Sequence, residues 1–107
     1  MNYQEQAYRE ITSVDVPEEK HKAEWTHQII AGAAAFEAMR LYNKKQAEEG
    51  PIDDHHLAKE IIAGLAGASV DHFAETKGID WVDRQKAKHA AKEDAEKLYT
   101  QQTGYEF

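Results

Sequence analysis

The residues best suited to chemistry are histidines and glutamates that stand three positions apart. Glu24 and His27 have the Glu-x-x-His spacing with which di-iron helix bundles point two metal ligands into their core. His72 and Glu75 repeat these residue types with the order reversed. Glu24, His27, His72 and Glu75 are therefore the candidate metal ligands, and an oligomer could bring the two pairs together.

A structural role for the same residues is the alternative. Di-iron bundles need two Glu-x-x-His motifs and two further glutamates, whereas only one motif here has the required order. On this interpretation Glu24 and His27 lie at a solvated helix edge. His72 falls beside Ile61 and Leu65 on a helical projection, so it would be a buried, hydrogen-bonded histidine.

A third role for histidine is pH sensing. Protonating all six histidines would add six positive charges to a chain whose formal net charge is −7, and unperturbed histidines titrate near pH ~6.5. If an interface holds His27 or His72 neutral, acidification would loosen an oligomer. Six independent titrations at the surface are the alternative.

Enzymatic chemistry has less support in the sequence. Glu60, Asp71 and Glu75 form an acidic edge on one predicted helix, and paired carboxylates can act in acid–base catalysis. No candidate nucleophile accompanies them, because the chain lacks cysteine and its only serines are Ser13 and Ser69. We therefore expect a protein without enzymatic activity and without a resident cofactor.

Charge and composition exclude several classes of partner. A net charge of −7 repels nucleic-acid phosphates and anionic lipid head groups. The longest apolar run, Ile29–Phe36, is far shorter than the ~20 residues that span a bilayer. The first residues lack the basic and apolar regions of a signal peptide, and the absence of cysteine fits a reducing compartment. We expect a cytoplasmic protein that neither binds nucleic acid nor spans a membrane.

The helical signals predict a single all-α domain over residues 1–107. The segment Ile29–Gly32 recurs as Ile61–Gly64, with small residues after both copies. We interpret this quasi-repeat as the two helices of one hairpin, packed closely through small side chains. Capping and turn residues give the ranges: an arm or short helix over 1–16, a first helix over 17–49, a second over 53–77, and a third, covering helix over 80–102.

Both hairpin helices have two apolar faces, which predicts neighbours on more than one side. In the second helix the two faces consist of Leu57, Ile61, Leu65 and Ala68, and of Ile62, Ala66, Val70 and Phe73. Glycine inside a helix costs about 0.5–1 kcal/mol relative to alanine, so Gly32, Gly64 and Gly67 predict close helix crossings. Because three helices cannot cover every apolar face, we expect a homodimer or higher oligomer with the repeat helices at its centre.

Three blocks of the sequence resemble a known family. They are His21–Met39, which includes the run HKAEWTHQIIAGAAAFEAM, the run KEIIAGLAGA of Lys59–Ala68, and Glu75–His89. These blocks resemble the fungal CipC-like family, named for concanamycin-induced protein C and often described as antibiotic response proteins. The resemblance covers roughly residues 20–100.

The resemblance implies a small cytosolic fungal protein linked to stress and to host or antibiotic response, and it carries over no catalytic residues. Together with the residue patterns, it predicts a non-enzymatic, homo-oligomeric binding or interaction module, whose partners are itself and a further protein or small molecule. The alternative is a metal- or small-ligand-binding helical bundle, possibly catalytic, that uses the His/Glu pairs.

Overall fold

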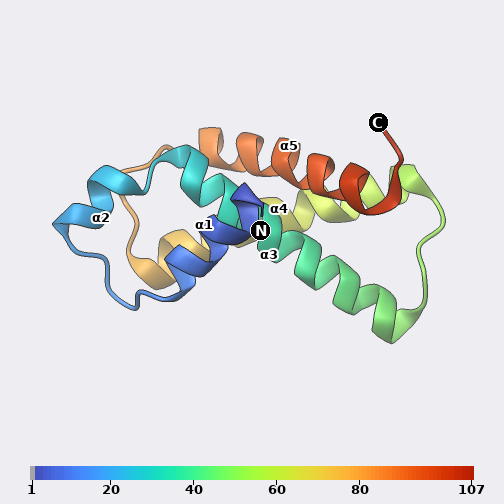
Figure 1. The fold of residues 1–107 in the computed structure, drawn as a ribbon, viewed down its shortest axis with the longest axis horizontal. Coiled ribbons are helices and arrows are strands. Elements are labelled where there is room, and N and C mark those ends of the chain that lie inside the picture. The colour runs from blue at the N-terminus through green and yellow to red at the C-terminus, as the bar shows by residue number, and fades with distance from the viewer. Residues whose placement is uncertain (1) are drawn as a thin grey trace.

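A central helix, α3 (His27–Glu49), is enclosed by its neighbours in the computed structural model, which describes residues 2–107. Three helices pack around it: α1 (Tyr3–Thr12), α4 (His55–Lys77) and α5 (Arg84–Thr103). The short helix α2 (Glu19–Glu24) leads into α3, and α5 runs along the long axis of the molecule (Figure 1). All secondary-structure elements in residues 2–107 are helices, which confirms the predicted all-α fold.

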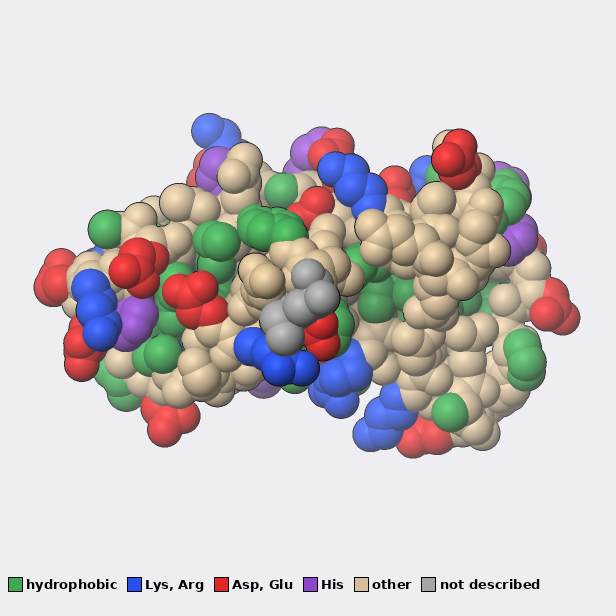
Figure 2. All heavy atoms as spheres, viewed as in Figure 1, with side chains coloured by type: hydrophobic (Ala, Val, Ile, Leu, Met, Phe, Trp, Pro, Cys, Tyr) green, Lys and Arg blue, Asp and Glu red, His purple; other side chains and the backbone are tan. Residues whose placement is uncertain are grey.

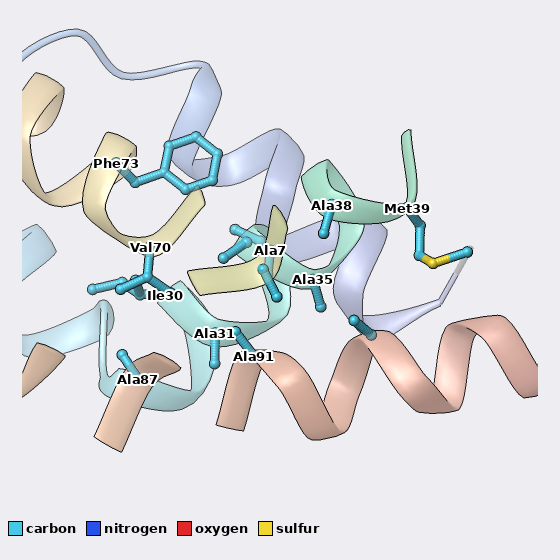
Figure 3. Packing of buried hydrophobic residues seen from close by; sticks show 14 of the residues in the cluster. Ala7, Ile30, Ala31, Ala35, Ala38, Met39, Val70, Phe73, Ala87 and Ala91 are labelled. Atoms are coloured by element: carbon cyan, nitrogen blue, oxygen red, sulfur yellow. The ribbon is translucent and has the colours of Figure 1, made fainter. Parts of the chain in front are cut away.

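Alanines allow this close packing around α3. Ala31, Ala34, Ala35 and Ala38 have no solvent-exposed surface, and they point in several directions around the helix axis. Small side chains let neighbouring helices approach closely, so α3 can be surrounded without voids. Figure 3 shows Ala31 of α3 and Ala91 of α5 directed into the space between the two helices.

The single helix expected over residues 17–49 is wrong, because the chain breaks between α2 and α3. Trp25 ends α2 with non-helical dihedral angles, and the Thr26 side chain caps α3 by accepting a hydrogen bond from the Ile29 N–H. The Trp25 side chain is fully buried, and its indole N–H donates to Glu10 at 3.0 Å. The Trp25 carbonyl, freed from helical pairing, accepts the indole N–H of Trp81 at 3.0 Å. Tertiary contacts therefore interrupt the helix here.

The predicted third helix begins later than expected. Residues 80–83 precede α5, and the Asp83 carboxylate caps it by accepting the N–H groups of Gln85 and Lys86. The preceding residue Trp81 is half-buried and committed to its hydrogen bond with Trp25, so the helix starts only after it. The second helix lies close to its predicted range of 53–77: Asp54 caps the start of α4, and the left-handed Gly78 ends it.

The glycines of the quasi-repeat do not pack against one another. Gly32 lies against α1, where an added Cβ would come within 2.9 Å of the Tyr3 ring. A Cβ at Gly64 or Gly67 would meet nothing within 4 Å. The expected close crossing therefore exists between α1 and α3, and the two glycines of α4 take no part in it. None of the helices in residues 2–107 is long and apolar enough to cross a membrane.

An aromatic cluster closes the opposite end of the molecule from α2. The Tyr99 hydroxyl lies 2.5 Å from His55 Nδ1, and Tyr105 stacks on the His55 ring at 3.8 Å. Tyr42 packs edge-on against Tyr99, and both are almost fully buried. Burial raises the pKa of Tyr42 and the pKa of Tyr99.

Replacing Tyr42 with phenylalanine is expected to make stability less sensitive to alkaline pH. Because the pKa of Tyr42 is raised above its ordinary value near ~10, the folded state keeps a proton that the unfolded chain releases. The contribution to the free energy of unfolding is therefore full below about pH 10 and is lost as pH rises toward the raised pKa. Urea unfolding at about pH 8 and about pH 11 measures this loss. An equal loss in wild type and Tyr42→Phe would contradict it.

Candidate functional site

The outer face of α4 is the candidate functional surface. It consists of residues at helical spacing: Leu57, Ile61, Gly64, Leu65 and Ala68. Leu57 is 47% exposed, Ile61 and Leu65 are half-buried, and Gly64 and Ala68 are exposed. The opposite face of α4 is buried against the rest of the chain through Ile62, Ala66, Val70 and Phe73. The two predicted faces of this helix are thus present: one is buried, and the other is only partly covered by the rest of residues 2–107.

Two glycines in the middle of α4 have no structural explanation within residues 2–107. Glycine inside a helix costs about 0.5–1 kcal/mol relative to alanine. At Gly64 and Gly67 a Cβ would enter open space, and both residues have ordinary helical conformations, so neither packing nor backbone geometry requires glycine. Glycine is useful at such a position when another backbone approaches it from outside.

A shallow groove borders this face on its α3 side. Its volume is about 270 Å³, and it is lined by Glu37, Leu41, Leu65, Ala68, Ser69 and His72. Leu41, Leu65 and Ala68 give the groove apolar surface, and Glu37, Ser69 and His72 add polar groups. The groove is open to solvent and suits an apolar side chain that projects from another surface.

The other border of the face, on the α5 side, is charged. Arg84 lies 3.4 Å from Asp71 and 3.6 Å from Glu75, and Lys88 lies 2.9 Å from Asp71. The hydrogen bond from Lys88 lowers the pKa of Asp71, and the nearby charge of Arg84 acts in the same direction. Glu60 lies on the same side of α4, nearer its N-terminus. It is exposed and makes no ion pair with any residue in the range 2–107.

Comparison with known proteins identifies the family. A family model described as virulence factor CipC-like matches residues 12–102. The chain belongs to the CipC-like family. No curated protein and no solved structure matches it. The match includes all of α2 to α4 and nearly all of α5. The whole outer face of α4 therefore lies within the region that matches the CipC-like family model.

The candidate metal ligands of this CipC-like chain are dispersed. Glu24 is the last residue of α2 and His27 the first of α3, so the break at Trp25 removes the helical i, i+3 geometry that motivated the pair. His72 and Glu75 are exposed on α4, and Glu75 pairs with Arg84. Within residues 2–107 no group of three or more His, Asp or Glu side chains is arranged to hold a metal ion. Metal binding through these four residues stays a prediction.

Charges of both signs surround the candidate surface of the CipC-like chain, and the sequence revealed only half of them. The acidic edge of Glu60, Asp71 and Glu75 was expected from α4 alone. Arg84 and Lys88 belong to α5, and only the packing of α5 against α4 places them at this edge. Acidic and basic side chains are also interspersed over the face shown in Figure 2.

Proposed function

We propose that this chain is a non-enzymatic interaction protein that works as a homo-oligomer, in a stress or antibiotic response of the fungal cytoplasm. The observation that carries the proposal is the outer face of α4, where Leu57 is 47% exposed and Ile61 and Leu65 are only partly buried against the rest of residues 2–107. Membership in a family described as virulence factor CipC-like supports a role in the response of a cell to its host or surroundings.

Exposed apolar area is the physical reason for expecting association. Three bulky side chains, Leu57, Ile61 and Leu65, share one helix face at intervals of four residues. Burying such surface gains about 25 cal/mol for each Å² removed from water. The central part of this face, from Leu57 to Ala68, has apolar or small side chains, the polar His72 and Glu75 follow it, and Ser69 beside it is only 3% exposed, which favours binding over catalysis.

Native mass spectrometry of protein purified from its own host tests the proposal. We expect a native mass that is a whole-number multiple of the 12.2 kDa chain, with no additional mass that leaves on denaturation. A monomer at low micromolar concentration would contradict the homo-oligomer. Additional mass of one metal ion per chain would instead support the His/Glu metal site, and the variant His72→Ala would then be expected to lose it.

A further inference from the structure

We propose that the outer face of α4 binds the same face of a second copy, with the two α4 helices antiparallel and the two-fold axis passing near Gly64 and Leu65. This inference rests on the proposed homo-oligomer and specifies its interface. Three properties of the surface support it: the distribution of large and small residues, the charges at its border, and its dimensions.

Large and small residues are placed so that two antiparallel copies complement each other. The bulky Leu57 and Ile61 occupy the first half of the face, and Gly64 and Ala68 occupy its centre and second half. About the proposed axis, Ile61 of one copy lies opposite Ala68 of the other, and Leu57 lies opposite the groove beside His72. Gly64 lies at the crossing point, where the absence of a side chain lets the two backbones approach.

The charged border is complementary under the same symmetry. A two-fold axis across antiparallel helices sets the α5 side of one copy against the α5 side of the other. Glu60, which has no ion pair in its own chain within residues 2–107, then lies opposite Ser69 of the second copy, two residues from Asp71. Arg84 and Lys88 gather at that level, and their cationic groups are suitable partners for the Glu60 carboxylate.

The dimensions of the molecule allow a stable dimer. Its longest and an intermediate axis measure 44 and 24 Å, so the projection of one whole long side is about 1,000 Å², of which the α4 face is one part. A standard interface buries about 800 Å² on each partner. The α4 face, together with the flanking surfaces of α3 and α5, can supply that area. A second copy therefore fits the surface in size as well as in charge.

A charge exchange across the interface tests the arrangement. Glu60→Arg and Arg84→Glu should each raise the dimer dissociation constant about tenfold, because each sets like charges against one another between the copies. The double variant should return the dissociation constant to within about threefold of wild type. Within residues 2–107 of one chain, Arg84 pairs with Asp71 and Glu75 and not with Glu60, so restoration by the double variant requires contact between copies. Analytical ultracentrifugation gives the dissociation constants.

A pair of glycine substitutions provides an independent measurement. Gly64→Ala should raise the unfolding midpoint of the monomer, since alanine favours the helix and its Cβ has open space, yet weaken the dimer about tenfold. Gly67→Ala is the matched control: its Cβ also has open space, but Gly67 lies ~60° around the helix from Gly64 and away from the crossing point, so we expect the same gain in monomer stability and a dimer within about threefold of wild type.

The outcomes separate the arrangement from the proposed function. If wild type forms an oligomer but the double variant does not regain affinity and Gly64→Ala leaves dissociation unchanged, the antiparallel α4 interface is wrong and the homo-oligomer stands. If wild type is monomeric, both proposals fail. Restored affinity in the double variant, together with weakening by Gly64→Ala alone, supports the arrangement.

Discussion

Replacing Trp25 with alanine is expected to lower the free energy of unfolding by about 3–5 kcal/mol. The Trp25 side chain is fully buried, its ring lies 4.9 Å from that of His21, and its indole N–H donates to Glu10. Alanine would leave a cavity where the indole packs and would remove the donor to the Glu10 carboxylate. Because small domains are stable by only about 5–15 kcal/mol, this loss is a large part of the total.

Urea unfolding followed by circular dichroism measures the effect, at one fixed protein concentration because association couples to stability. Trp25→Phe is the matched control. It keeps an aromatic ring in the pocket and removes the hydrogen bond to Glu10, so we expect a smaller loss of about 1–2 kcal/mol. A loss below about 1 kcal/mol for Trp25→Ala would show that the segment between α1 and α3 is not anchored by this side chain.

The tertiary contacts of Trp25 also explain why the sequence wrongly predicts one continuous helix over residues 17–49. No glycine or proline lies between Ala23 and Gln28, so local signals predict an unbroken helix there. The break depends on Trp81, whose indole N–H reaches the Trp25 carbonyl from 56 residues away. A contact so distant in sequence leaves no local pattern. By contrast, the caps Asp54 and Gly78 act only on neighbouring residues, and the helix between them lies close to its predicted range of 53–77.

At the candidate site, too, local patterns are predictable from the sequence and long-range packing is not. The periodicity of α4 predicts both of its faces, because burial on one side of a helix repeats every three to four residues. Which face of α4 remains exposed depends on where α3 and α5 pack against it, and the sequence alone does not contain that register. The expectation that glycines mark close crossings was correct at Gly32, where the Tyr3 ring is 2.9 Å from an added Cβ. At Gly64 an added Cβ would meet nothing within 4 Å, so a close crossing there would require a second molecule.

Replacing Ala31 with leucine is expected to destabilise the fold by about 3 kcal/mol or more, because it adds three carbon atoms to a space that has no room for them. Ala31 has no exposed surface and faces Ala91 between α3 and α5 (Figure 3). Helices that cross through alanines lie too close together to admit a leucine without separating. Separating α5 from α3 would also displace α5 from α4, since α5 packs against both helices.

The exposed Ala47, on the same helix, provides the matched control. Ala47→Leu adds the same three carbon atoms in solvent, and leucine is nearly as good a helix former as alanine, so we expect a change within about 0.5 kcal/mol. Comparing the two variants by urea unfolding isolates the cost of crowding from any effect of helix propensity. Equal stability of both variants would mean that α3 can separate from α5 at little cost. In that case the enclosed alanines of α3 would not hold α5 close to it.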